Sequence, residues 1–283
     1  MNRPDGNRVK NATAVVQALP YIMPKRYDAQ NWANDYVDDD ILRAYIREKK
    51  KEDKVVTRMS LLIAAYYKAV LENPNVNRFI VNRKIYQRNH FCVSFVILKT
   101  RADGTPDETS LKVFLQPEDT VFTISERIKK MIDDNLNQEY NNSTDKFVNV
   151  AFSIPGLARL IFGLAYLLDQ IGLLPRAIID LSPFHTSLFI TNLASINTTC
   201  IHHHCYEFGT TSVFICMGRP EDKLGDVKGK RLPLGVVMDE RIATGIEYSR
   251  FFTAFQRYLR HPHVLETRLD GKDAEEPACA AQV

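Results

Sequence analysis

The chain has 283 residues, 45% of them hydrophobic and 25% charged, an ordinary globular balance that can fill a sizeable core. Its formal net charge of +3, with no long Lys/Arg block, argues against a nucleic-acid-binding protein. The five cysteines show no CxxC spacing, and residues 1–10 lack the apolar core of a signal peptide. These features favour free thiols in a reducing cytoplasm.

The first predicted elements are helices. Residues 1–20 are polar and mixed, and we expect a flexible arm there. Residues 40–51 carry apolar side chains on one face and lysines at the C-terminal end, which is typical of an amphipathic helix. Ser60 is predicted to cap a second helix over residues 61–72, which ends before Pro74.

Two strands and a helix are predicted next. Residues 91–98 and 110–115 are strand-like and are joined by the turn-rich stretch 101–108. Thr123 and Glu126 form a capping-box pattern at the start of an amphipathic helix.

Residues 152–181 are the most apolar part of the chain. Arg159 and Asp169 bracket only nine uncharged residues there, whereas a membrane-spanning helix needs about 20. Three interpretations stay open: a buried helix, which is the simplest, a partner-binding helix, or a helix lying at a membrane surface.

Three further strands are predicted at residues 187–192, 211–217 and 232–238, followed by a long helix over 246–262. No Gly/Ser-rich linker or internal repeat interrupts the chain. The order of elements predicts a mixed α/β (α+β) domain whose mixed sheet is flanked by helices.

The predicted organisation has three parts. Residues 1–20 form the arm, residues 21–265 form one domain with an apolar helical insertion at about 143–185, and residues 266–283 form a disordered tail.

Four segments, in this order, resemble the acyltransferase family that contains chloramphenicol acetyltransferase and the dihydrolipoyl acyltransferases. Residues 60–98 have the family's layout of a helix, an Asn-Pro pair and a strand. FITNLASI at 189–196 is similar to the family's F-T-I-S-N-L-G, and SVFICMGRP at 212–220 resembles a strand that ends in L-G-V-G. Residues 232–262 resemble the C-terminal signature, in which a strand runs into D-H-R-x-x-D-G and then a helix.

The resemblance places the family's C-terminal signature on one short stretch. Asp239 falls on its Asp, Glu240 on its catalytic His, Arg241 on its Arg, Thr244 on its second Asp and Gly245 on its Gly. The glutamate and the threonine therefore replace the two residues that carry most of the chemistry.

The resemblance implies acyl transfer between coenzyme A and a second nucleophile. A neutral histidine suits this reaction because its pKa lies close to the working pH. A carboxylate is a much poorer base, so Glu240 would need burial to replace it. The second Asp of the family pairs with an arginine, and Thr244 cannot, which leaves an arginine such as Arg26 in need of another partner. Gly245 is expected to allow a tight turn into the last helix.

The resemblance also implies a hydroxyl that stabilises the oxyanion of the reaction. Thr191 lies on the family's serine, with Ser195 as a weaker candidate. The alternative is that Thr191 is an ordinary strand threonine.

IHHHCYEFG at 201–209 half-matches the family's H-H-x-x-x-D-G, but Phe208 occupies the Asp position and a strand follows instead of a helix. Three interpretations stay open for His202, His203 and His204: a polar loop or subunit contact, a relocated base, or a metal site with Cys205. No metal is expected, because the zinc-binding spacings HExxH and paired CxxC are missing. If the loop is extended, His202 and His204 point to one side and His203 to the other.

Two hypotheses follow for function. The chain is either a catalytically degenerate acyltransferase-fold protein, a pseudoenzyme with a binding, scaffolding or regulatory role, or an active enzyme that uses coenzyme A and takes Glu240 or a relocated histidine as its base. The resemblance implies a homotrimer in either case. A partner or membrane-surface contact through residues 152–181 would make a cytoplasmic protein membrane-peripheral. The stretch before Tyr21 is too short for a lipoyl domain, so a conventional place in a 2-oxo acid dehydrogenase complex is not expected.

Overall fold

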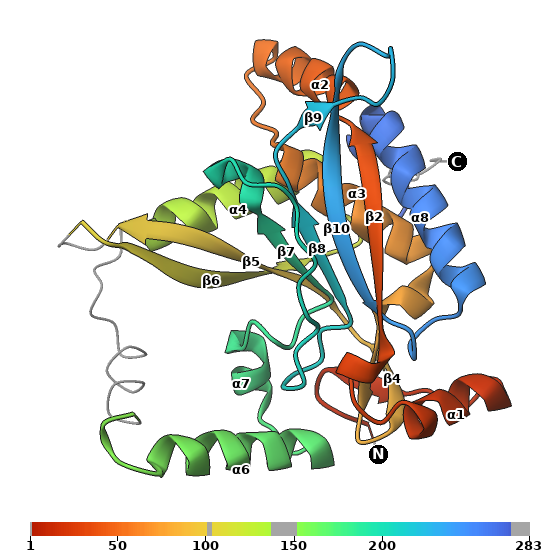
Figure 1. The fold of residues 1–283 in the computed structure, drawn as a ribbon, viewed down its shortest axis with the longest axis vertical. Coiled ribbons are helices and arrows are strands. Elements are labelled where there is room, and N and C mark those ends of the chain that lie inside the picture. The colour runs from red at the N-terminus through yellow and green to blue at the C-terminus, as the bar shows by residue number, and fades with distance from the viewer. Residues whose placement is uncertain (1, 101–103, 137–151, 273–283) are drawn as a thin grey trace, which may run out of the picture.

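The computed structural model describes residues 2–100, 104–136 and 152–272. Within these residues, a seven-stranded sheet of order β2-β10-β8-β7-β5-β6, with β9 beside β10, runs through the middle of the molecule (Figure 1). The β5–β7 and β7–β8 pairs are parallel and the other pairs are antiparallel. The strands are β2 (Gln30–Asp38), β5 (Phe91–Thr100), β6 (Pro106–Leu115), β7 (Leu188–Asn192), β8 (Val213–Met217), β9 (Glu221–Asp222) and β10 (Lys230–Asp239). The predicted mixed α/β architecture is confirmed.

A second, smaller sheet involves the N-terminal residues. Its order is β1-β4-β3, all antiparallel, with β1 (Gly6–Arg8), β3 (Arg78–Val81) and β4 (Lys84–Arg88). Helix α1 (Ala14–Ile22) follows β1, and Arg3 and Asp5 are buried. The stretch expected to be a flexible arm is therefore packed on the body. The polar sequence of this stretch did not predict the packing, because β1 pairs with β4, which lies far along the chain.

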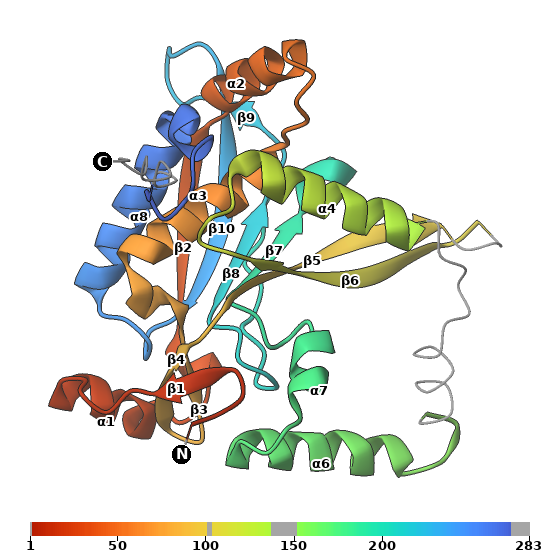
Figure 2. The same cartoon turned by 180° about the vertical axis from the view of Figure 1, so that it is seen from behind.

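Four helices cover one face of the large sheet (Figures 1 and 2). They are α2 (Asp39–Lys51), α3 (Arg58–Glu72), α4 (Val121–Leu136) and α8 (Gly245–Arg260). Short 3-10 helices lie at Tyr27–Ala29, Pro74–Asn77, Leu193–Ile196 and Pro262–Leu265.

Two helix starts differ from the expectation. Thr57 is the N-cap of α3, and Ser60 is the reciprocal partner of a capping box rather than the cap itself. In the same way, Thr120 and Thr123 exchange hydrogen bonds between backbone N–H groups and hydroxyls, so α4 begins at Val121. In both helices, a second hydroxyl residue lies three positions before the predicted one, and the apolar pattern does not show which of the two is the N-cap.

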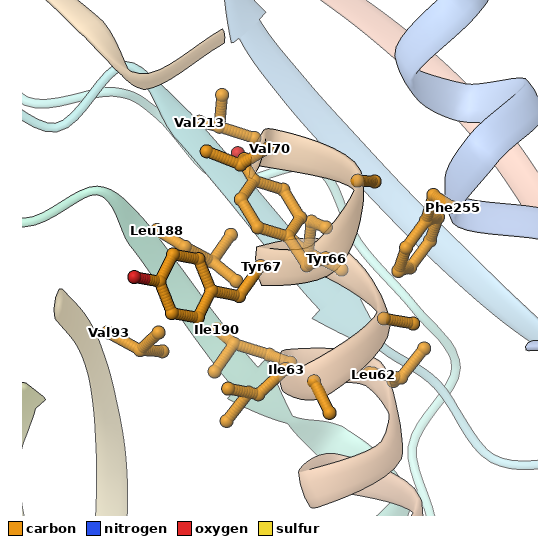
Figure 3. Close-up of a cluster of buried hydrophobic side chains, with 14 of the residues drawn as sticks. Leu62, Ile63, Tyr66, Tyr67, Val70, Val93, Leu188, Ile190, Val213 and Phe255 are labelled. Atoms are coloured by element: carbon orange, nitrogen blue, oxygen red, sulfur yellow. The ribbon is translucent and has the colours of Figure 1, made fainter. Parts of the chain in front are cut away.

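Helix α3 forms the centre of the core (Figure 3). It lies between the sheet and α8, and most of its side chains are buried, which explains why it is apolar on nearly every side. Tyr66 packs edge-on against Phe251 of α8, with ring centroids 4.9 Å apart, and Tyr67 stacks on Phe91 of β5 at 4.0 Å. The main hydrophobic core therefore lies on the helix-covered face, and a separate, smaller cluster with Phe189 and Phe214 lies on the opposite face of the sheet.

Helices α6 (Leu157–Ile171) and α7 (Arg176–Leu181) stand away from the four-helix layer (Figures 1 and 2). Among the described residues of α6, only Asp169 is buried. The simplest interpretation of this apolar stretch, a buried helix, is therefore wrong for these residues. The local pattern shows that the helix is apolar but does not show what it faces. Within the described residues, no helix is both long and apolar enough to cross a membrane.

The end of the predicted domain extends past residue 265. Leu269 is buried, and its carbonyl oxygen accepts a hydrogen bond of 3.0 Å from the Lys68 ammonium group. The backbone N–H groups of Leu269 and Asp270 also donate to Asp119 and Pro117, so the chain packs against the body as far as residue 270. Residues 273–283 of the predicted tail, and residues 143–151 of the predicted insertion, lie outside the described residues.

Candidate functional site

The C-terminal motif (residues 239–245) begins where β10 ends. Asp239 is buried, and its carboxylate accepts two hydrogen bonds from the Arg241 guanidinium, at 2.8 and 2.7 Å. This forked geometry is among the strongest charge-assisted pairings in proteins. Burial alone would lower the pKa of Arg241, but the hydrogen bonds to Asp239 outweigh it and raise the pKa. Asp239 and Arg241 thus form a buried ion pair.

Arg26 has a defined partner as well. Its Nε lies 3.6 Å from Asp239 Oδ2, and its two Nη groups donate to the carbonyl oxygens of Tyr206, Gly209 (3.2 Å) and Ile80 (3.1 Å). The arginine expected to lose its acidic partner is therefore paired with the first Asp of the motif. It also ties the motif to the loop that contains Tyr206 and Gly209.

Thr244 serves as the N-cap of α8. It forms a capping box with Glu247, whose carboxylate accepts a hydrogen bond of 2.6 Å from the Thr244 backbone N–H. A threonine is a good residue for this position. Gly245 is the first residue of α8, its φ lies outside the left-handed region, and an added Cβ would meet no atom within 4 Å. The expected tight turn at Gly245 is therefore not found, because the N-cap already sets the direction of the chain.

Glu240 differs from its neighbours in the motif. Its side chain is exposed, and within the described residues it makes no hydrogen bond or ion pair. Its backbone N–H donates to the carbonyl oxygen of Ala29 at 2.8 Å, so the backbone is fixed although the side chain is free. Glu240 lacks the burial that a carboxylate needs to become an effective base.

The second site-like cluster lies on the sheet face opposite the four helices. Thr191 on β7 and Phe214 on β8 point to this face, and the histidine loop (residues 201–209) crosses it. His203 Nε2 lies 3.1 Å from the Thr191 hydroxyl, and its ring stacks on Phe214 with centroids 4.3 Å apart. The structure thus brings together the threonine predicted from the family's serine position and one of the three predicted histidines.

The environment of His203 favours the neutral imidazole. Burial lowers the pKa of this ring below the usual 6.5, and the neighbouring His204 lowers it further. A neutral ring with its lone pair on Nε2 accepts the Thr191 hydroxyl proton as a hydrogen bond. A hydroxyl hydrogen-bonded to a neutral imidazole is the arrangement used in general-base catalysis.

The start of the histidine loop lies directly against the backbone of the sheet. An added Cβ at Gly218 or Gly235 would come within 2.3 Å of the backbone of Cys200 or Ile201, so glycine is required at both positions. His203 points toward the sheet.

The other polar side chains near this loop have separate roles. His202 Nε2 lies 3.2 Å from the Ala33 carbonyl oxygen, and Cys205 is buried, which raises the pKa of its thiol to about 12. Within the described residues, no group of His, Cys, Asp and Glu side chains is placed to hold a metal ion. Ser195 donates to the Asn192 carbonyl oxygen at 2.7 Å.

The two clusters are far apart in a single chain. Thr191 is level with Cys216, which is level with Gly235 on β10, and Glu240 lies five residues further along. At 3.3 Å per residue this register separates Thr191 from Glu240 by about 17 Å along the strands. The sequence singled out Arg26 as an arginine in need of a partner but did not predict that it bridges to the histidine loop, and it did not predict the stacking on Phe214, because both contacts join residues far apart in the chain.

No protein-family model and no curated protein sequence matches the chain. Solved structures match it over nearly its whole length. The probable dihydrolipoamide acetyltransferase of Listeria monocytogenes has 15% identity and a TM-score of 0.55, over 90% of this chain and 95% of that chain. The cubic core of the pyruvate dehydrogenase multienzyme complex has 11% identity and a TM-score of 0.56, over 92% and 94%. Chloramphenicol acetyltransferase has 10% identity and a TM-score of 0.53, over 90% and 99%. The chain therefore has the chloramphenicol acetyltransferase-like fold.

Proposed function

We propose that this chain is a coenzyme A-dependent acyltransferase in which His203, instead of a residue at position 240, is the general base. The observation that carries the proposal is the contact between His203 Nε2 and the Thr191 hydroxyl. The lowered pKa of the ring keeps it neutral at physiological pH, and therefore able to accept a proton.

The chemistry assigns one role to each residue. The acceptor thiol or hydroxyl displaces Thr191 at Nε2 and gives its proton to His203 as it attacks the thioester carbonyl. The Thr191 hydroxyl then turns to the carbonyl oxygen and stabilises the tetrahedral oxyanion. When the carbon–sulfur bond breaks, His203 returns the proton to the coenzyme A thiolate, so acyl-CoA and acceptor become free CoA and acylated acceptor.

The assembly is part of the proposal. The family resemblance implies a homotrimer with the active site between subunits. A light-scattering mass equal to one chain would contradict this part.

The test follows release of free CoA from acetyl-CoA and longer acyl-CoAs, with thiol, hydroxyl and amine acceptors. We expect turnover that falls by about 10²–10⁴ in His203→Ala, the usual contribution of a general base. His202→Ala is the matched control, because this neighbouring histidine is exposed and does not reach Thr191. Turnover that survives in His203→Ala and disappears in Glu240→Gln would instead assign the base to Glu240.

The second candidate function is a catalytically degenerate protein with a binding or scaffolding role. The side chain of Glu240, at the family's histidine position, is exposed and makes no hydrogen bond or ion pair within the described part of the chain, which favours this candidate. It predicts no turnover with any acceptor. Calorimetry then separates its two forms, because a scaffold that keeps the ligand channel still binds acyl-CoA and one that has lost the channel does not.

A further inference from the structure

Helix α6 differs from an ordinary surface helix because, among its described residues, only Asp169 is buried and many of its large apolar side chains are exposed. Tyr166, Asp169 and Gln170 face the body, where Asp169 is buried and the other two line a cavity. The opposite side carries an apolar stripe with spacings of four, three and four residues, at Leu160, Leu164, Leu167 and Ile171. Leu160 is 67% exposed and Leu167 56% exposed. A surface helix in water normally buries such a stripe.

A buried ionic cluster fixes this orientation. Asp169 Oδ1 accepts a hydrogen bond of 2.6 Å from Arg3 and lies 3.3 Å from His185 Nε2, and Arg3 also pairs with Asp5 at 2.9 Å. Burial alone would raise the pKa of the Asp169 carboxyl, but the neighbouring His185 ring and Arg3 charge lower it. Turning the helix over would break these contacts, so the apolar stripe is held facing outward.

More exposed apolar side chains lie at this end of the molecule. Helix α1 lies at the same end of the long axis (Figures 1 and 2) and exposes Val15, Tyr21 and Ile22. Further exposed apolar side chains flank α6 in sequence, at Phe152, Ile154, Leu173, Ile178 and Leu181. Such an accumulation of exposed apolar side chains marks an interaction surface.

A cationic pocket adjoins this surface. A cavity of about 380 Å³ is lined by Tyr166 and Gln170 of α6 and by Lys25, Arg26, Arg83 and Arg241. The carboxylate of Glu207 in its wall is already held by the backbone N–H groups of Arg26 and Tyr27. Within the described residues, Lys25 and Arg83 pair with no carboxylate.

A tight hairpin turn presents Arg83. Asn82 and Arg83 are the two residues between β3 and β4, and their φ angles of 47° and 56° are those that a type I′ hairpin turn requires. The turn holds Arg83 at the edge of the cavity, close to the apolar surface.

We propose that this end of the molecule docks on an anionic lipid surface. The apolar stripe of α6 enters the boundary between headgroups and acyl chains, and the pocket with Lys25 and Arg83 takes a headgroup phosphate. Charge decides between this occupant and a second copy of the chain. Two copies meeting through this end would bring their unpaired Lys25 and Arg83 side chains together, whereas an anionic lipid neutralises them.

Flotation with vesicles tests the proposal on the full chain. We expect binding to vesicles of phosphatidylcholine mixed with phosphatidylglycerol, and weaker binding to phosphatidylcholine alone. The triple variant Leu160→Ser/Leu164→Ser/Leu167→Ser should lose more than about tenfold in affinity for both. Lys25→Gln/Arg83→Gln should lose about fivefold for each charge removed, roughly 30-fold together, on the anionic vesicles only.

The matched controls lie in the loop between β9 and β10, at the opposite end of the long axis (Figures 1 and 2). Leu224→Ser/Val227→Ser removes exposed apolar side chains there, and Lys228→Gln removes an exposed charge. All changed side chains are exposed, and circular dichroism verifies that each variant is folded.

Three results would overturn the proposal. The first is no flotation of the wild-type protein with anionic vesicles. The second is flotation that the α6 triple variant retains. The third combines two observations: the wild-type protein does not bind vesicles, and light scattering shows a wild-type oligomer whose mass falls in the α6 triple variant. This result would assign the surface to a second copy of the chain. Because the assay involves no acyl-CoA, its outcome is independent of whether His203 acts as a base.

Discussion

The C-terminal motif and the histidine loop both resemble the family's catalytic signature, and they differ in what surrounds them. In the motif, the residues that match the family, Asp239 and Arg241, form a buried ion pair, while Glu240 is exposed and has no partner within the described residues. In the loop, His203 is half-buried, stacked on an aromatic ring and in contact with a hydroxyl. The two stretches therefore differ in their environment although both resemble one motif.

Arg26 joins these two regions physically. It contacts Asp239 on one side and the backbone carbonyl oxygens of Tyr206 and Gly209 on the other. Whatever the role of Glu240, the motif can hold the histidine loop in place through this arginine. The retained Asp239 and Arg241 are thereby explained without a catalytic role.

The largest expected effect is on the motif's ion pair. Asp239→Asn removes the carboxylate that pairs with both buried arginines, Arg241 and Arg26, and we expect a loss of about 3–5 kcal/mol in the free energy of unfolding. Urea unfolding measures it, with the exposed Asp226→Asn as control. A loss below about 1 kcal/mol, the range of exposed ion pairs, would show that the pair is not structural.

The pH dependence of acyl transfer comes next. The pKa of His203 is lowered in the folded chain, so the ring stays neutral, and the rate stays level, as pH falls to 6.5 and somewhat below. Below the folded-state pKa the base is protonated, and kcat/KM should fall about tenfold per pH unit. The same folded-state shift means that stability is fully present above pH 6.5 and decreases as pH falls through that value.

Glu240→Gln sharpens this pH test. If His203 is the base, the acid limb of the profile is the same in the wild type and in Glu240→Gln. An acid limb that disappears in Glu240→Gln would move the base back to the C-terminal motif.

The helix cap is a smaller effect within the motif. Thr244→Ala removes the N-cap hydroxyl of α8 and should cost about 1 kcal/mol in the free energy of unfolding. Ser249→Ala, at an exposed position inside the same helix, is the control and should have almost no effect. If the midpoint of urea unfolding is the same in Thr244→Ala and the wild type, Glu247 alone stabilises the start of the helix.

Glu240→Gln should have the smallest effect on stability. Its side chain is exposed and makes no contact within the described residues, so we expect the melting temperature to change by no more than about 1–2 °C. A larger fall would reveal a partner for Glu240, such as a residue of a neighbouring copy in an oligomer.

Local patterns were sufficient to predict the central strands and most of the helices that cover them, but not β1 to β4 or α1. The period of the apolar residues predicts α2, α3 and α8 and the central strands to within a few residues, because one buried face requires that period. The four segments that resemble acyltransferases predict the fold, and the matching solved structures confirm it. Helix starts were less certain, as Thr57 and Thr120 show, because several hydroxyl residues can cap the same helix.

Only the tertiary structure decided which groups meet. The sequence determined that His202, His203 and His204 are adjacent, but the packing of the loop on Gly218 and Gly235 determined that His203 reaches Thr191. The sequence determined that α6 is apolar, but the contact between Asp169 and Arg3 determined that its apolar side faces outward. Both outcomes depend on contacts between residues far apart in the chain, and hydrophobic periodicity, which reports only on near neighbours, does not contain them.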